Sequence, residues 1–147
     1  ANGDGVAGNP TYSLPTVSTF TPTVTLVGGA GNVTPVYTTN TGRHFRFGNI
    51  VFVDVYLDGD GGAEGAGTGQ INVALPVAAN ASHPGGSFLV GVETNGTSNL
   101  IVGGAIGPSA TTIALSIQTI LATFASFTGA DQNNVTRTIR LQFHYEA

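Results

Sequence analysis

The stretch GNIVFVDVYLD, residues 48–58, decides how the rest of the chain is interpreted. Its odd positions, from Val51 to Leu57, are all aliphatic, whereas its even positions mix aromatic, aliphatic and acidic side chains. Alternation with a period of two, in a segment rich in β-branched residues, is typical of a strand with one face in a core. A helix of this composition would restrict side-chain rotamers at nearly every position. The stretch therefore predicts a β-strand.

Short apolar segments bounded by Gly, Pro and Asn continue this pattern along the chain. The clearest is the last one, TRTIRLQFHYEA, which again alternates apolar and polar residues. The other predicted strands lie at 20–29, 34–38, 43–47, 71–77, 87–93, 100–106 and 111–117. Pro22 marks the first as an edge strand, and Gly48-Asn49 predicts a tight turn before residue 50. Residues 118–130 are ambiguous, and we allow one or two helical turns there.

Eight or nine short strands without a long helix predict an all-β protein. An antiparallel β-sandwich or barrel fits the spacing, and a jelly-roll-like sandwich suits the strand number best. We expect residues 20–147 to form this knob domain. Residues 1–19 contain Gly and Pro without periodicity, and we expect them to form a flexible, extended N-terminal arm. Tyr12, Leu14 and Val17 are the side chains expected to anchor the arm to a partner; an unanchored, fraying arm is the alternative.

The chain carries very little charge. Charged residues make up 8% of it, against roughly 25% in an ordinary globular protein, and there is no lysine. Such a surface is poorly protected against association, and charge is depleted where subunits meet. We therefore expect an oligomer, with a monomer made soluble by hydroxyl and amide groups as the alternative. The arginines, which we expect to pair with acidic groups of a neighbouring subunit, are Arg43, Arg46, Arg137 and Arg140.

Several partner classes are disfavoured by the same composition. A net charge of −4 without a basic run argues against nucleic acid, and no apolar run approaches the roughly 20 residues of a membrane span. The first ten residues, ANGDGVAGNP, lack the basic and apolar regions of a signal peptide. With no Cys in the chain, disulfides and thiolate metal sites are excluded. We expect no cofactor, no nucleic acid and no membrane among the partners.

Two groups of residues are candidate metal sites. The acidic residues cluster around a DGDGG sequence and are Asp54, Asp58, Asp60 and Glu64. This sequence resembles part of a calcium loop, but no closing Glu follows at the right spacing, so a solvated turn is the favoured interpretation. His44, His83 and His144 are far apart in sequence. They are interpreted as surface or interface residues, with a metal-binding triad at a three-fold axis as the alternative.

No arrangement of residues predicts catalysis. The chain contains neither a G-x-S-x-G motif nor a Cys, and no pair of separated carboxylates stands out. The glycine-rich loop 59–69 lacks Lys and leads into a strand, whereas a phosphate-binding loop leads into a helix. We therefore expect that the protein is not an enzyme.

Four stretches together resemble a domain that is common in tailed-phage structural proteins. They are FTPTVT (20–25), Tyr37 followed by TGRHFRFGNIVFVDVYL (together 37–57), GQINVALPV (69–77) and FHYEA (143–147). The resemblance covers residues 20–147 and concerns turn and core positions, so it assigns no functional residues. It implies a small trimeric β-sandwich of the kind found at the tips of tail fibres and spikes, or as knobs on capsids.

The resemblance leaves two functions to compare. Fibre-tip domains usually follow a long shaft, whereas here about 19 residues precede the domain. This favours a capsid decoration (cement) protein: a homotrimer on the major capsid protein that stabilises the virion shell, assembled in the bacterial host cytoplasm. The alternative is a receptor-binding tip whose loops 59–69, 78–86 and 94–99 recognise a host glycan or protein. A carbohydrate-active enzyme is a third hypothesis, which would require a carboxylate pair in a groove.

Overall fold

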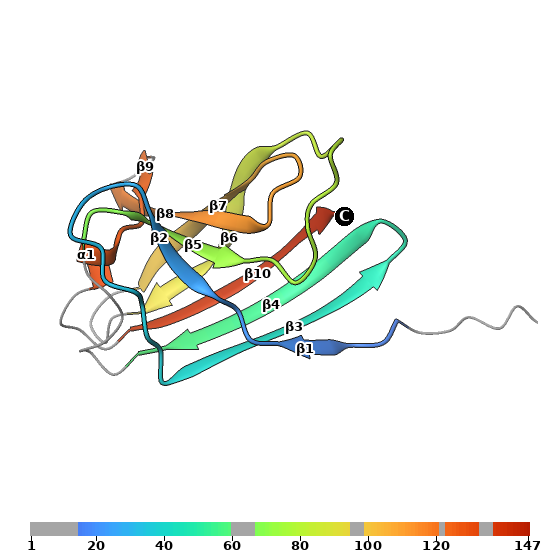
Figure 1. The fold of residues 1–147 in the computed structure, drawn as a ribbon, viewed down its shortest axis with the longest axis horizontal. Coiled ribbons are helices and arrows are strands. Elements are labelled where there is room, and N and C mark those ends of the chain that lie inside the picture. The colour runs from blue at the N-terminus through green and yellow to red at the C-terminus, as the bar shows by residue number, and fades with distance from the viewer. Residues whose placement is uncertain (1–14, 60–66, 95–98, 121–122, 133–136) are drawn as a thin grey trace, which may run out of the picture.

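A computed structural model describes residues 15–59, 67–94, 99–120, 123–132 and 137–147 of the chain. These residues form ten strands and one short helix (Figure 1). The elements are β1 (Ser18–Phe20), β2 (Val24–Val27), β3 (Thr39–Phe47), β4 (Ile50–Asp58), β5 (Gln70–Ala74), β6 (Gly86–Thr94), β7 (Asn99–Ile106), β8 (Thr112–Ile120), β9 (Thr123–Ser126), α1 (Gly129–Gln132) and β10 (Thr138–Glu146). The prediction of an all-β protein is confirmed.

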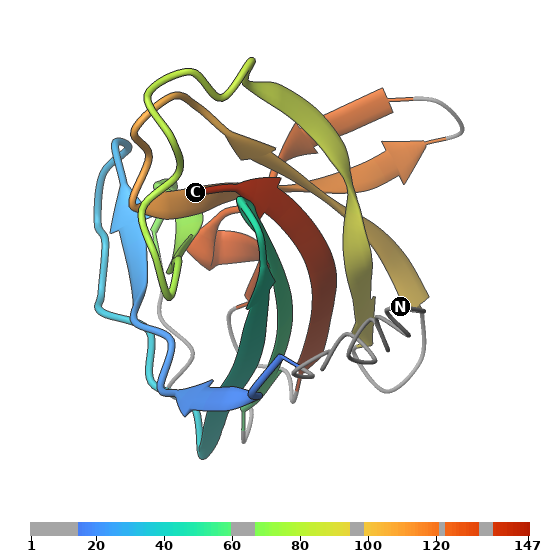
Figure 2. The same ribbon diagram turned by 90° about the vertical axis from the view of Figure 1, so that its right-hand side faces the viewer.

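The ten strands form one continuous antiparallel sheet, in the order β1-β3-β4-β10-β6-β7-β8-β5-β2, with β9 paired to β8 beside this path. The sheet curls around its core (Figure 2). Only residues 21–23 separate β1 from β2, although these strands end opposite edges of the order, so the curl brings the two edges together. At this corner Asn40 Nδ2 donates to the carbonyl of Pro22, at 2.5 Å. The finer prediction of a two-sheet jelly roll is not confirmed, because the hydrogen bonding is continuous.

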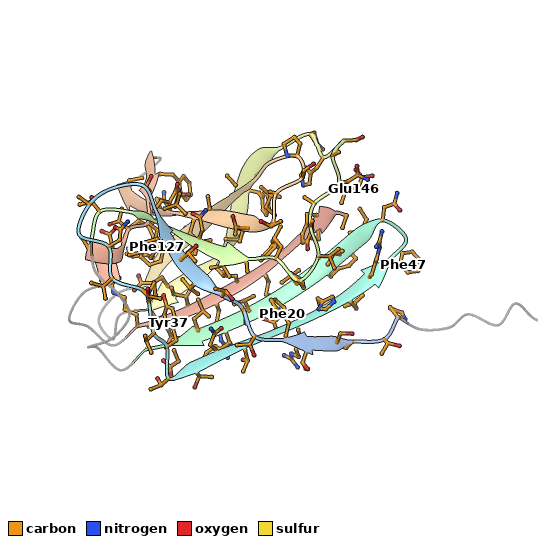
Figure 3. The ribbon with its side chains drawn as sticks, in the orientation of Figure 1. Phe20, Tyr37, Phe47, Phe127 and Glu146 are labelled. Atoms are coloured by element: carbon orange, nitrogen blue, oxygen red, sulfur yellow. The ribbon has the colours of Figure 1, made fainter. Side chains whose placement is uncertain are left out.

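The core is built from alternate residues of the central strands, as the period of two predicted. The odd residues of β4 from Val51 to Leu57 are at most 5% exposed, and those of β10 from Ile139 to Tyr145 at most 7%. These two strands pair along their whole length, so their apolar residues form one continuous wall. Phe127 is fully buried at the end of the molecule near α1, whereas Phe47 lies at the opposite end (Figure 3).

The predicted turn between β3 and β4 is confirmed. Gly48 has a φ of 59°, in the left-handed region that glycine adopts without strain. However, the strand predicted at 34–38 is wrong, because these residues contain none, and the strand predicted at 43–47 is the second half of the longer strand β3. Residues 40–42, predicted as a turn, pair with β4. Gly42 is required there for packing, since a Cβ would collide with the ring of Phe20.

The helical turns allowed at 118–130 are also misplaced. β8 continues to residue 120, and β9 pairs back onto it, with Gln118 opposite Phe124. Pairing with β8 therefore overrides the helical spacing of the apolar residues. The helix α1 begins only at Gly129, where Asp131 Oδ2 accepts a hydrogen bond from Thr128 N at 2.8 Å. No helix within the described ranges has the length and apolar character that a membrane crossing needs.

The segment predicted as the arm is partly paired. Ser18 and Thr19 belong to β1 and lie opposite His44 and Arg43 of β3. Residues 15–17 precede this strand and are exposed, while residues 1–14 lie outside the described ranges. The described part of the chain therefore begins at one edge of the sheet.

Candidate interaction surface

One face of the sheet points away from the core along β3, β4, β10, β6 and β7, and we call it the outer face. Residues opposite each other on neighbouring strands share a face, so the register aligns the side chains in rows. The rows are Phe45, Phe52 and His144; Arg43, Asp54 and Gln142; and Thr41, Tyr56, Arg140, Val92 and Ile101. The even residues of β4 supply one member of each row, because its odd residues fill the core.

The first row is an aromatic stack at the surface. The rings of Phe45 and Phe52 are nearly parallel, with centroids 4.7 Å apart and an interplanar angle of 9°. His144 continues the stack, with its ring centroid 5.6 Å from that of Phe52. These rings line a groove of about 450 Å³ together with Val17, which precedes β1. Val17 is 59% exposed, so the predicted anchor residue is a wall of this groove.

Apolar side chains extend the outer face beyond the aromatic row. Phe47 is 70% exposed at the β3–β4 turn, and Phe52 is 38% exposed in the middle of the face. On β6 and β7, Val92 and Ile101 lie opposite each other and are 44% and 42% exposed. Single exposed apolar residues are common on soluble proteins, but several of them on one face of a sheet make that face a candidate interaction surface.

Arg43, Asp54 and Arg140 of the outer face contact other groups of the chain. Arg43 forms an ion pair with Asp54, at 2.9 Å between Nη2 and Oδ2. Both side chains are exposed, so this pair contributes little to stability. The guanidinium carbon of Arg140 lies 5.2 Å from the ring centroid of Tyr56, a cation–π contact. The exposed apolar side chains of this face therefore lie among charged side chains that are paired with an opposite charge or stacked on an aromatic ring.

The remaining two arginines lie away from this face. Arg46 donates to the carbonyls of Gly48, at 2.8 Å, and Ala147, at 2.7 Å, and so ties the β3–β4 turn to the end of the chain. Arg137 forms an ion pair with Glu93, with 2.6 Å between Nη1 and Oε1. All four arginines thus contact groups of their own chain, and their predicted pairing with a neighbouring subunit stays a prediction.

Glu93 is a residue whose importance the sequence did not reveal. It is fully buried, opposite Ile139 on the core side of β6. Burial raises the pKa of its carboxyl above the ordinary value of 4.5, although Arg137 acts in the opposite direction. Its Oε2 has no hydrogen-bond partner among the described residues. The sequence shows one acidic residue in the strand predicted at 87–93. Whether its side chain faces the core depends on how that strand pairs with its neighbours, which is decided only in the folded sheet.

The acidic residues near the predicted turn do not gather into a site. Asp54 is paired with Arg43, and Asp58 Oδ1 accepts a hydrogen bond from Thr138 Oγ1 at 2.9 Å. Asp60 and Glu64 lie outside the described ranges. The calcium alternative for this loop therefore stays untested.

The three histidines have three different environments. The ring of His44 packs edge-on against Phe20, with 5.7 Å between the centroids. Nδ1 of His83 accepts a hydrogen bond from Gly85 N at 3.1 Å, and His144 belongs to the aromatic stack. Within the described ranges, no three His, Cys, Asp or Glu side chains are grouped so as to hold a metal ion.

Two of the three predicted arm anchors, Tyr12 and Leu14, lie outside the described ranges, so the structure places only Val17. Of the predicted recognition loops, 78–86 is described, while most of 59–69 and 94–99 is not. The outer face was not singled out in the sequence, because its residues come from five strands whose order the sequence does not specify.

Comparisons with known proteins add no relative. No protein-family model matches the chain, and a search among curated proteins finds no similar sequence. The resemblance to phage knob domains therefore stays a prediction, and the function must be argued from the surface itself.

Proposed function

We propose that this chain is a non-enzymatic structural protein whose copies associate through the outer face and coat a larger scaffold. The setting that we propose is a phage virion, with a homotrimer acting as a capsid decoration protein on the major capsid protein. The observation that carries the proposal is the set of exposed apolar and aromatic side chains on the outer face, on a chain with 8% charged residues.

Two physical features of this surface favour self-association. Apolar area removed from water contributes about 25 cal/mol per Å², so exposed aromatic rings gain free energy when a second surface covers them. Aromatic residues are also enriched and charges depleted at the centres of protein interfaces. Phe47, Phe52 and Val92 supply this area. The internal pairing of Arg43 and Asp54 lowers the desolvation cost of covering it.

The stabilising mechanism that we propose is mass action. A protein that binds the assembled shell, and not its dissociated subunits, shifts the equilibrium toward the shell. Joining several copies in one oligomer makes each further contact intramolecular, so weak individual contacts add up to strong binding. No chemical reaction is required for this role.

Introducing a charge on the outer face should break the oligomer. We expect Phe47→Asp to shift the chain toward monomer in sedimentation velocity, because the carboxylate would be desolvated in the interface. The 70% exposure of Phe47 means that the substitution leaves the core intact. Val27→Asp is the matched control, since Val27 is 55% exposed on the edge strand β2, away from the outer face.

The control should sediment like the wild-type chain. A wild-type chain that is monomeric at micromolar concentration would refute the proposal of self-association. Equal dissociation by both variants would show that the outer face has no special part in it.

The place in the virion can be tested by electron microscopy. An antibody against the chain should label phage heads at many positions if the protein decorates the capsid. Labelling confined to the tail tip would instead support the receptor-binding alternative. The groove favours this alternative, because it combines Phe45 and Phe52 with the polar groups of Arg43 and Asp54, a mixture common in ligand sites.

A further inference from the structure

The loop between β5 and β6, residues 75–85, lies beside the C-terminal end of β10 (Figure 1). Its first half is fixed by the backbone of Asn80. The N–H of Asn80 donates to the carbonyl of Glu146 in β10 at 2.9 Å, and its carbonyl accepts from Ser109 N at 3.2 Å. Ser109 lies between β7 and β8, so Asn80 joins the loop to two other parts of the sheet.

Two turns of this loop are closed by side chains. Asn80 Oδ1 accepts a hydrogen bond from Ser82 N at 2.8 Å, and His83 Nδ1 accepts one from Gly85 N at 3.1 Å. In both turns a side-chain acceptor bonds to the N–H two residues later, which is typical of Asn and Asp. Pro84 has no N–H, so Gly85 carries the first backbone donor after His83. His83 therefore has the same role in the second turn that Asn80 has in the first.

The second turn differs from the first because its acceptor can titrate. An amide oxygen accepts hydrogen bonds at any ordinary pH, whereas a ring nitrogen of histidine accepts only while it is unprotonated. Because Nδ1 of His83 accepts from Gly85 N, the proton of the neutral ring lies on Nε2. In the charged ring Nδ1 also carries a proton, which would point at the N–H of Gly85. The closed turn is therefore compatible only with the neutral ring.

The other nitrogen of the ring does not compensate for this conflict. Nε2 of His83 is buried and has no hydrogen-bond partner among the described residues. A charged ring in the closed turn would thus hold two N–H donors without a protein acceptor, which is a costly arrangement for a buried group. If the turn opens, water can accept from both nitrogens. Protonation of His83 therefore favours the open turn.

The loop and β10 enclose a pocket of about 640 Å³, and His83 is part of its lining. The titratable groups that β10 contributes to this lining are His144, Tyr145 and Glu146. Arg46 of β3 acts electrostatically on Tyr145 from the same end of the molecule. Residues 75–85 contain no ionisable side chain besides His83, and residues 107–111 between β7 and β8 contain none. None of these neighbouring groups is hydrogen-bonded to the His83 ring.

We propose that His83 is a pH-dependent latch of the loop between β5 and β6. The neutral ring closes the turn of residues 83–85 beside β10, and protonation opens the turn and widens the pocket. Because the closed turn holds the neutral ring, its stability is present at high pH and is lost as the pH falls. A free histidine side chain titrates at about pH 6.5, so a comparison of pH 8 with pH 5 covers the change. The latch requires neither self-association nor a partner.

Nuclear magnetic resonance of the full-length, 15N-labelled chain tests the latch directly. At pH 8 we expect the ring nitrogens of His83 to show a proton on Nε2 and none on Nδ1. Lowering the pH to 5 should shift the His83 ring and the Gly85 amide with a common midpoint. The protection of the Gly85 amide against hydrogen exchange, corrected for the intrinsic pH dependence of exchange, should fall about tenfold, as expected for the loss of one hydrogen bond.

Two substitutions at position 83 separate the acceptor from its titration. His83→Asn supplies an amide oxygen that can bond to the N–H two residues later, as Asn80 does, and it cannot be protonated in this pH range. We expect the Gly85 amide of this variant to keep its protection at pH 5. His83→Ala has no acceptor, so its Gly85 amide should be weakly protected at both pH values.

Two further variants remove the neighbouring titratable groups. His144→Asn and Glu146→Gln alter side chains that line the same pocket and leave the turn of residues 83–85 unchanged. The pH response of the Gly85 amide should persist in both. Its loss in either variant would show that the neighbouring group, and not His83, controls the turn.

Several other results would overturn the latch. They are a proton on Nδ1 of His83 at pH 8, a ring that stays neutral at pH 5, and a Gly85 amide that does not respond while the ring titrates. A pH response of His83→Asn equal to that of wild type would overturn it as well. Because the measurement follows the turn itself, each of these results leaves the proposed function intact, and a monomeric chain would leave the latch intact.

Discussion

At the scale of single residues, one buried hydroxyl joins the end of the chain to a loop. Tyr145 is 2% exposed, and its hydroxyl donates to the carbonyl of Val77 at 2.6 Å and accepts from Val77 N at 3.3 Å. Burial raises the pKa of Tyr145 to about 12, so the hydroxyl remains protonated at neutral pH. This side chain fastens the segment after β5 onto β10.

Removing that hydroxyl should destabilise the fold. We expect Tyr145→Phe to lower the free energy of unfolding by about 1–3 kcal/mol, because both backbone groups of Val77 lose their partner in a partly buried place. Urea denaturation followed by circular dichroism measures the change. Tyr56→Phe is the control, since it retains the ring beneath Arg140 and should change stability little. Equal losses in the two variants would contradict this assignment.

The buried Glu93–Arg137 pair should make stability depend on pH. A raised pKa means that the folded chain holds the proton of Glu93 more tightly than the unfolded chain does. The contribution of Glu93 is therefore complete below its ordinary pKa of 4.5 and is lost as pH rises through the raised value. Besides Arg137, the nearby charge of Asp131 acts on this carboxyl and raises its pKa further.

Comparison with Glu93→Gln isolates this effect, because Gln cannot ionise. The difference in unfolding free energy between wild type and variant should change in favour of the variant as pH rises from about 4 to about 8. Urea titrations at several pH values measure it. A difference that stays constant, or changes in favour of wild type, would show that Arg137 dominates the environment of the carboxyl.

At the scale of elements, the contact between β6 and β10 depends on a close backbone approach. A Cβ on Gly91 would collide with the carbonyl oxygen of Arg140 in β10. Glycine is therefore needed where β6 joins β10, immediately beside the register shift in the pairing of β6 with β7. The residue at position 91 thus determines how closely β6 can approach β10.

Substitution of this glycine should weaken the joint. We expect Gly91→Ala to cost about 1–3 kcal/mol or more, because the backbone must shift to relieve the overlap. Hydrogen exchange should also accelerate at the amides of β6 and β10 that pair there. Gly107→Ala serves as the control, since a Cβ at Gly107 meets no atom within 4 Å. Similar stability in both variants would contradict the close approach.

The elements differ in how well the sequence predicted them. β4 and β10 follow directly from alternation, because each has one face in the core and one outside. β3 and β9 do not: Gly42 suggests a turn, and the apolar residues near residue 124 have helical spacing, yet long-range pairing holds both segments as strands. Local signals fail where a neighbouring strand supplies the hydrogen bonds.

At the scale of the whole molecule, the low charge should make association insensitive to salt. The outer face is mainly apolar, and its ion pair of Arg43 and Asp54 is internal to the chain. Raising NaCl to about 1 M shortens the Debye length to about 3 Å and should leave the association constant nearly unchanged. Ammonium sulfate should strengthen association, because sulfate is excluded from apolar surface. Sedimentation velocity measures both, and dissociation by NaCl would indicate ionic contacts between subunits.

The sequence by itself determined that the chain is an all-β protein of short antiparallel strands, because alternation and turn residues are local properties. It also determined the scarcity of charge, which motivates the proposal of association. Only the tertiary structure decided which strands are neighbours, since that order is set by contacts between residues far apart in the chain. The outer face and the burial of Glu93 both depend on that order. Each combines residues from several strands, and no local sequence pattern predicts that these residues come together.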